Sequence, residues 1–124
     1  MSIMYPVICH YEDDGYWCEF PDVEGCFSQG DSVSEVVNNA KEALECHLEY
    51  YLENNDVLPK ATDLSEIKTS GKDFATYIEI DLAKTDKAMR KNVTVPSWLG
   101  KKAESLSINF SQTLQEALLK KIGY

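Results

Sequence analysis

The sequence predicts an α+β protein in two parts, a β-β-β-α-β domain over residues 1–82 and a β-α-α domain over residues 90–124. Two runs rich in aromatic and β-branched residues around an acidic turn indicate a hairpin. A stretch of about twenty residues with helical apolar spacing follows. A polar–apolar alternation that stops at a proline opens the second part. Residues 83–89 are expected to link the two domains.

The first domain opens with a strand–turn–strand pattern. Tyr5–Tyr11 and Tyr16–Phe20 flank the turn EDDG at 12–15, whose Asp-Gly ending is a strong hairpin signal. A short third strand is expected near Cys26–Gln29. Adjacent strand residues face opposite sides, so one member of the pair Tyr16-Trp17 is expected in the core and the other on a partner-facing patch.

A long helix is expected next. Ser32 and Glu35 have the spacing of a capping box, in which the serine caps the first turn of a helix. Apolar residues then recur at helical spacing, which predicts a helix that ends at Asn54-Asn55.

A returning strand completes the first domain. A loop with Pro59 and a helical turn near 63–68 lead to a strand expected at Phe74–Leu82. A right-handed crossover predicts that this strand lies parallel to the first. One helix covers only one face of such a sheet, so the other face is expected to receive a partner or a second copy.

The second domain begins with the segment RKNVTVP at 90–96. In a strand, Val93 and Val95 share one face, which can be buried. The opposite face presents a guanidinium, an amide and a hydroxyl, the groups that read base edges in the major groove. These belong to Arg90, Asn92 and Thr94.

Two short amphipathic helices follow, expected at Ser97–Ser107 and Asn109–Ile122. Pro96 cannot donate to a strand ladder but suits the first turn of a helix, so the strand is expected to stop there. One short strand and two helices give little core. The economical arrangement is therefore a dimer whose strands pair as an antiparallel ribbon over four helices, and the alternative is an edge hairpin with incidental polar residues.

The charge divides at the same place. Residues 1–82 hold 4 Lys or Arg and 18 Asp or Glu, a balance of −14, and residues 83–124 hold 8 and 3, a balance of +5, which together give −9. The acidity of the whole chain argues against a nucleic-acid partner. The C-terminal part is basic, however, so this argument does not apply to it. Two partners of opposite charge are indicated, although the acidic part can also be simply a soluble body.

Other features favour a cytoplasmic protein. No apolar run reaches the roughly 20 residues needed to span a bilayer, so no membrane association is expected. The N-terminus lacks the basic region and cleavage site of a signal peptide. The four cysteines show no C-x-x-C spacing, which disfavours zinc and redox sites and indicates reduced thiols. They are Cys9, Cys18, Cys26 and Cys46.

No enzymatic site is expected, and neither a cofactor nor a metal. Two-metal nucleases need carboxylates that converge from several elements, and the first strand carries none. The carboxylates of the long helix and Asp81 are better explained as solvated groups. His10 and His47 lack the orienting group and oxyanion site of a hydrolase, so half-buried structural roles are favoured for both.

The strand–helix–helix pattern of residues 89–124 resembles the ribbon-helix-helix repressors, the MetJ/Arc class. That resemblance implies base contacts by Arg90, Asn92 and Thr94. Phosphate contacts would fall on Lys91 and on the start of the second helix, where Asn109 is a good N-cap. Gly100 inside the first helix, and a turn at 106–108 without glycine, depart from the family pattern. The residues implied at the helix start are Asn109, Phe110 and Ser111.

The run GYWCEFPDVEGCFSQGDS at 15–32, followed by NAKEAL at 39–44, resembles the HicB family of antitoxins, and with the ribbon the resemblance spans nearly the whole chain. It implies a degenerate, partial RNase H-like N-terminal domain. It also implies a HicA-type partner, a small basic ribonuclease, and repression of the antitoxin's own operon through operator DNA. A homodimer through the C-terminal domain is expected, with a tetramer as a further possibility.

The resemblance and the acidic charge suggest where the toxin binds. Carboxylates at the hairpin tip and in the following loop are the candidates: Glu12, Asp13, Asp14, Asp22 and Glu24. Two alternatives stay open. The chain could be a stand-alone ribbon-helix-helix regulator whose N-terminal domain senses a ligand or drives assembly, or a vestigial nuclease with residual metal-dependent activity.

Overall fold

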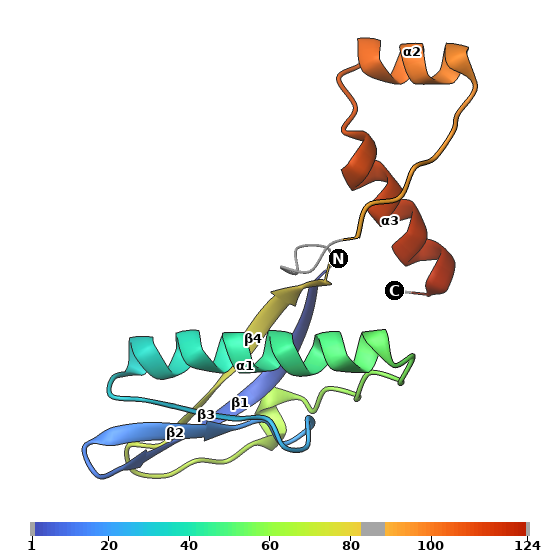
Figure 1. The fold of residues 1–124 in the computed structure, drawn as a ribbon. Coiled ribbons are helices and arrows are strands. Elements are labelled where there is room, and N and C mark those ends of the chain that lie inside the picture. The colour runs from blue at the N-terminus through green and yellow to red at the C-terminus, as the bar shows by residue number, and fades with distance from the viewer. Residues whose placement is uncertain (1, 83–88, 124) are drawn as a thin grey trace. The chain divides into compact units, whose positions relative to one another are not determined.

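The computed structural model describes residues 2–82 and 89–123, so nearly all of the expected linker at 83–89 lies outside the described residues. The chain forms two compact units, Ser2–Asp81 and a second that begins at Leu82 (Figure 1). Each unit is described by itself. The fold is α+β, as predicted.

The N-terminal unit is a four-stranded sheet with one long helix on one face (Figure 1). The strands lie in the order β3-β2-β1-β4, and each neighbouring pair is antiparallel. Its elements are β1 (Ser2–Glu12), β2 (Gly15–Glu19), β3 (Phe27–Gly30), α1 (Val33–Glu53), the 3₁₀ turn η1 (Leu64–Glu66) and β4 (Phe74–Asp81).

The hairpin between β1 and β2 has a two-residue turn. Asp13 and Asp14 both have positive φ, 52° and 60°, and Glu12 pairs with Gly15. Positive φ at both central positions is typical of a type I′ turn, whose twist matches that of the flanking strands. The hairpin prediction is confirmed, but the two left-handed positions fall on aspartates and not on the glycine. The Tyr11 hydroxyl donates to Asp14 Oδ1 at 3.1 Å.

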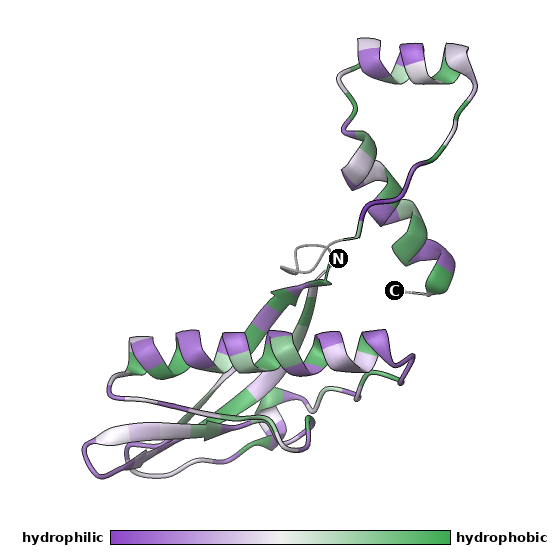
Figure 2. Cartoon of the chain, viewed as in Figure 1, coloured by the Kyte–Doolittle hydropathy of each residue, from purple (hydrophilic) through white to green (hydrophobic). Residues whose placement is uncertain are grey.

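Helix α1 begins and ends where its capping residues predict. The Ser32 hydroxyl accepts a hydrogen bond from the Glu35 backbone N–H at 3.1 Å, which satisfies one of the free amides of the first turn. Asn54 is the C-cap residue, and Asn55 follows with a φ of 56°. The helix buries a single stripe against the sheet, and Figure 2 shows apolar and polar residues alternating along it. The stripe consists of Val36, Ala40, Leu44 and Leu48.

The core of this unit lies between α1 and one sheet face. Strand pairing places Cys9 opposite Cys18 in β2 and opposite Phe74 in β4, so alternate residues of three strands face the helix. The most buried of these side chains are 0–4% exposed and make the main apolar contacts of the unit. They include Tyr5, Val7, Cys9, Cys18, Ile78 and Ile80.

The predicted direction of the last strand was wrong. Strand β4 is antiparallel to β1, with Cys9 paired to Phe74 and Ser2 paired to Asp81. The crossover rule assumes that the strand starts near the end of the helix. Here residues 54–73 first carry the chain back along the sheet, so β4 starts beside the far end of β1. The loop is held on this path by the Tyr5 hydroxyl, which donates to the Pro59 carbonyl.

The C-terminal unit contains α2 (Ser97–Ser105) and α3 (Phe110–Ile122), close to the expected helices. The strand expected at 90–96 is not formed in the single chain. This segment has no strand partner among the described residues, since the only partner that the sequence suggests is the same segment of a second chain. The turn between the helices places Ser107 at a φ of 56°, the conformation that glycine usually supplies.

Candidate partner-binding surfaces

Apolar side chains of the C-terminal unit are unusually exposed. Within the described residues 89–123 none is buried. Val93 is 64% exposed and Trp98 is 69% exposed, values typical of a surface that lacks its partner. The other large exposed apolar residues of this unit are Met89, Val95, Leu99, Leu106, Ile108, Phe110, Leu114, Leu118 and Ile122.

The candidate base-reading residues precede this apolar surface. Arg90, Asn92 and Thr94 are all exposed in the segment before α2, and so is Lys91. Their side chains are therefore available to a ligand. The single chain does not bring them onto a paired strand.

The start of α3 has the geometry expected of a phosphate-binding helix terminus. Asn109 Oδ1 accepts a hydrogen bond from the Gln112 backbone N–H at 3.0 Å, which confirms Asn109 as the N-cap. The first backbone N–H groups of a helix have no acceptor within it. Those of Phe110 and Ser111 thus point out of the helix end, where the helix dipole favours an anion.

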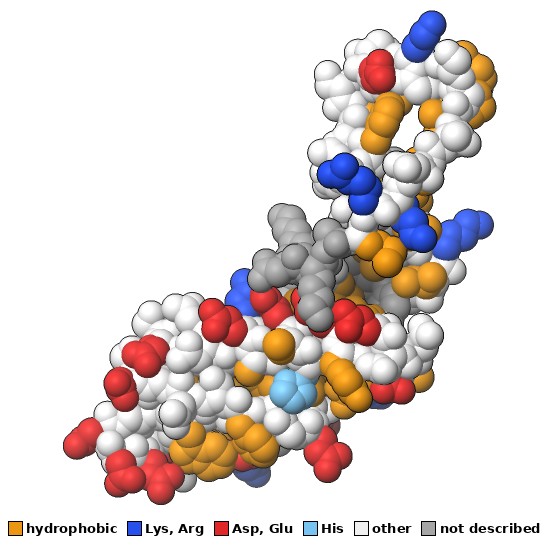
Figure 3. Space-filling model, viewed as in Figure 1, with side chains coloured by type: hydrophobic (Ala, Val, Ile, Leu, Met, Phe, Trp, Pro, Cys, Tyr) orange, Lys and Arg blue, Asp and Glu red, His pale blue; other side chains and the backbone are white. Residues whose placement is uncertain are grey.

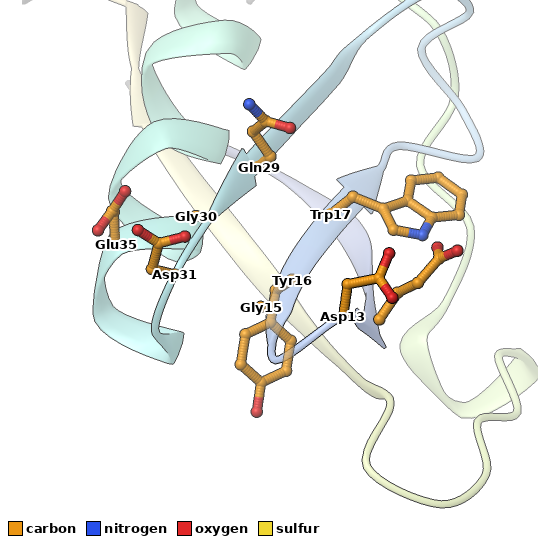
Figure 4. A pocket seen from close by; sticks show the side chains of 9 residues that line it. Asp13, Gly15, Tyr16, Trp17, Gln29, Gly30, Asp31 and Glu35 are labelled. Atoms are coloured by element: carbon orange, nitrogen blue, oxygen red, sulfur yellow. The ribbon is translucent and has the colours of Figure 1, made fainter.

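The tip of the β1–β2 hairpin is a concentrated acidic site. Glu12, Asp13 and Asp14 are exposed there. Glu12 and Asp13, together with Asp31 just before α1 and Glu35 in its first turn, line an open depression of about 680 Å³ beside Trp17 (Figure 4). No Lys or Arg lines this depression, so it favours a cationic ligand.

The two candidate carboxylates of the next loop differ in their availability. Glu24 is exposed. Asp22 is half-buried, and its two oxygens both accept hydrogen bonds from Thr62, from the hydroxyl at 2.6 Å and from the backbone N–H at 2.9 Å. Asp22 therefore fastens the loop 54–73 to the β2–β3 connection, which leaves its carboxylate occupied.

One cluster escaped the sequence analysis. On the sheet face opposite α1, His10 stacks on Trp17 with ring centroids 4.3 Å apart and planes at 22°. His10 Nδ1 lies 3.3 Å from Asp73 Oδ2, and Nε2 lies 3.7 Å from Glu19 Oε2. Asp73 is 63 residues from His10. No local sequence pattern joins two residues so far apart.

Asp73 is the last residue of the loop before β4, and its carboxylate also contacts the backbone of β1. Its Oδ1 accepts the Tyr11 backbone N–H at 2.8 Å. This hydrogen bond, followed by the contact with His10, lowers the pKa of Asp73 from its ordinary value. The cluster thus keeps a negative charge on the face that carries Trp17.

Tyr16 and Trp17 face opposite sides of the sheet, as predicted, but both are half-buried and Tyr16 is not part of the fully buried core. Tyr16 lies on the helix side of the sheet and packs edge-on against Tyr11 and Phe74. Trp17 lies on the opposite side, half-buried against His10. Of the pair, Trp17 is therefore the residue on the side of the sheet away from α1.

The cysteines are all free thiols, and three of them belong to the core. Cys9, Cys18 and Cys26 are buried, whereas Cys46 on α1 is exposed. Burial raises the pKa of Cys26 to about 12, so this thiol stays protonated at neutral pH. Among the described residues, no three His, Cys, Asp or Glu side chains come together as a set able to hold a metal ion.

The division of charge is visible on the molecular surface. In Figure 3, red carboxylates are spread over the N-terminal unit, and blue Lys and Arg side chains gather on the C-terminal unit. Across the part of the chain that is described, the structure contains no helix with the length and hydropathy of a membrane span.

Comparison with known proteins gives a consistent result. Residues 5–122 match the family model described as HicB_like antitoxin of bacterial toxin-antitoxin system. An uncharacterised 14.9 kDa protein of Haemophilus phage HP1 is 41% identical over 101 residues, which cover 78% of this chain and 76% of that protein. Antitoxin HicB 1 of Photorhabdus laumondii is 29% identical over 99 residues, or 79% of this chain and 58% of the antitoxin.

The fold is similar to that of a solved complex. A chain of a toxin–antitoxin complex from Streptococcus pneumoniae superposes with a TM-score of 0.62 and 25% identity. The match covers 98% of this chain and 99% of that one, so both units take part in it.

Proposed function

Since this chain belongs to the HicB-like family of bacterial antitoxins, we propose that it neutralises a small basic ribonuclease toxin by direct binding and represses its own operon by binding DNA. The observation that carries the proposal is the charge division, 4 basic and 18 acidic residues over 1–82 against 8 and 3 over 83–124. The net charge of each unit is therefore opposite to the charge of one of the two proposed partners.

Toxin neutralisation falls to the N-terminal unit. A ribonuclease binds a polyanion, so its active face must be basic. An acidic body competes for that face, and opposite potentials accelerate the encounter. Occlusion of the toxin's active site then requires no inhibitor chemistry. The exposed carboxylates Glu12, Asp13, Asp14 and Glu24 are the best placed of the sequence candidates, because Asp22 is held by Thr62.

DNA binding falls to the C-terminal unit as a homodimer. Its exposed valines and helix residues form a core only when a second chain covers them, and the same pairing would turn residues 90–96 into a two-stranded ribbon. The ribbon would present Arg90, Asn92 and Thr94 to base edges in the major groove. Lys91 and the start of α3 would hold phosphates.

The antitoxin is proposed to act without catalysis and to work in the cytoplasm, where its toxin cleaves RNA. β1 carries one carboxylate, Glu12, which is exposed at the hairpin tip, and among the described residues it belongs to no group of carboxylates able to hold a metal ion. The exposed carboxylates of the hairpin are therefore assigned to recognition.

Two assays on the intact protein test the two activities. The toxin is taken as the small basic product of the adjacent reading frame, and its cleavage of RNA should fall to background at about equimolar antitoxin. For DNA, the Arg90→Ala, Asn92→Ala double variant should stay dimeric but lose selective operator binding, since each good base contact is worth roughly 1–3 kcal/mol. Full cleavage at a large excess of folded antitoxin would remove the toxin assignment. Unchanged operator affinity in the double variant would remove the ribbon as the reader.

A further inference from the structure

We propose that the toxin docks on the sheet face opposite α1, with Trp17 as the central anchor and a Lys or Arg side chain of the toxin beside it. This inference rests on the proposed function and adds the surface and the chemistry of recognition. The face is called the open face below. It carries alternate residues of the four strands, including His10 of β1, Trp17 of β2, Phe27 of β3 and Tyr77 of β4.

The open face keeps exposed apolar surface, although the loop 54–73 covers part of it: the Leu64 N–H donates to the Tyr77 hydroxyl at 2.8 Å, and the Pro6 side chain is fully buried. Phe27 is 62% exposed, Met4 is 48% exposed and Tyr77 is 36% exposed. On the helix side of the same strands, the core residues Tyr5, Val7, Cys9, Cys18, Ile78 and Ile80 are only 0–4% exposed. Exposed aromatic and methionine side chains grouped on one side of a sheet are typical of a protein-binding surface.

Carboxylates surround the aromatic anchor. Trp17 stacks on His10, whose ring nitrogens face Asp73 and Glu19. On the hairpin side, Glu12 and Asp13 line the same depression that Trp17 borders (Figure 4). An indole bordered by carboxylates suits an ammonium or guanidinium group, through cation–π contact and charge-assisted hydrogen bonds.

Charge complementarity selects a basic protein over a second copy of the chain. Two open faces brought together would oppose Glu12, Glu19 and Asp73 of one copy to the same groups of the other. Like charges juxtaposed in an interface repel one another, so self-association through this face is disfavoured. A basic ribonuclease pairs these carboxylates.

The outer side of α1 is the competing surface, and it provides matched controls. Glu42 is exposed there, and Tyr50 is 65% exposed. It has carboxylates and one exposed aromatic residue, but the His10–Trp17 stack lies on the other side of the sheet. Hot spots in interfaces centre on aromatic residues within a packed surround, which favours the open face.

The test compares equal substitutions on the two surfaces by measuring the Kd of the intact antitoxin for the toxin, the basic product of the adjacent reading frame. Trp17→Ala should weaken binding at least tenfold, and Tyr50→Ala should change it less than twofold. Glu79→Lys places a positive charge on an exposed residue of the open face and should weaken binding severalfold with a slower association rate. Glu42→Lys, the same change on α1, should leave both values near those of the wild type.

The possible results distinguish failure of toxin binding from toxin binding at a different surface. Circular dichroism identifies a Trp17→Ala variant that fails to fold, and the exposed Glu79→Lys variant then decides. If the wild type does not bind the toxin, the proposed function fails. If the wild type binds but Glu42→Lys is weakened and Glu79→Lys is not, the toxin docks on α1 and the inference is overturned. A change in the antitoxin's own oligomeric state with unchanged toxin affinity would assign the open face to a second copy and would equally overturn it.

Discussion

Gly30 of β3 lies so close to the start of α1 that a Cβ at this position would come within 2.4 Å of the Val36 backbone nitrogen. Real Cβ contacts are not this short, so the absence of a side chain is what lets the helix rest on the strand. Because Val36 opens the buried stripe of α1, the contact sets how the helix sits on the whole sheet.

Gly30→Ala should therefore lower the free energy of unfolding by about 1–3 kcal/mol, the usual cost of overpacking. Urea unfolding of the intact protein measures it. Gly100→Ala is the matched control, since a Cβ there would meet Val95 Cγ2 at an ordinary 3.4 Å and alanine is the better helix former. A Gly30→Ala variant as stable as the wild type would show that α1 does not depend on this close approach.

Thr62→Val should cost about 1 kcal/mol of stability, because it removes the hydroxyl that donates to Asp22 and leaves that half-buried oxygen with one donor fewer. Thr62→Ser keeps the hydroxyl and is the control in the same thermal or urea titration. Toxin affinity should be equal in the two variants. Weaker toxin binding by Thr62→Val at full stability would mean that Asp22 acts in recognition and not in fastening the loop.

Asp73→Asn should reduce stability at neutral pH but not in strong acid. The pKa of Asp73 is lowered below 3.8 in the folded chain, chiefly because the Tyr11 N–H donates to it. A lowered pKa adds stability above the unfolded value, and this stability is lost as the pH falls through the folded value. The difference between wild type and variant, followed by urea unfolding from pH 7 to pH 2, should thus shrink below about pH 4. A difference independent of pH would assign the effect to packing instead of charge.

Val93→Asp should dissociate the proposed dimer, because it would place an unpaired charge in the apolar layer between two chains. Sedimentation over a range of concentrations should show a dimer for the wild type and a monomer for the variant. Asn92→Asp, on the other side of the strand, should remain dimeric while losing DNA affinity. A folded wild-type monomer at every concentration would contradict the ribbon assignment.

Local features of the sequence predicted most of the N-terminal unit. The Ser32 cap, the apolar period of α1 and the hairpin turn are decided by neighbours within a few residues, and each is confirmed. The direction of β4 depends instead on the path of residues 54–73, which is set by contacts such as those of Pro59 and Thr62 with distant strands. The crossover rule considers only the handedness of the connection and does not include such contacts.

The candidate site residues likewise divide into those that the local sequence predicts and those that depend on contacts between distant residues. The exposed hairpin carboxylates and the Asn109 cap follow from the local sequence. The His10–Asp73 contact joins β1 to the residue before β4, and it could be found only once the antiparallel pairing was known. A strand at 90–96 cannot form in one chain, so its geometry remains a prediction about the dimer.

A single ribonuclease assay that separates the two units tests the proposed division of function most directly. Residues 1–82 contain the whole apolar core of the N-terminal unit, so the fragment should fold, as circular dichroism can verify. With the basic product of the adjacent reading frame as the toxin, this fragment should stop RNA cleavage without residues 83–124, weakened relative to the intact protein only by lost avidity. It should show no operator binding. Full RNA cleavage at a large molar excess of the folded fragment would contradict the account.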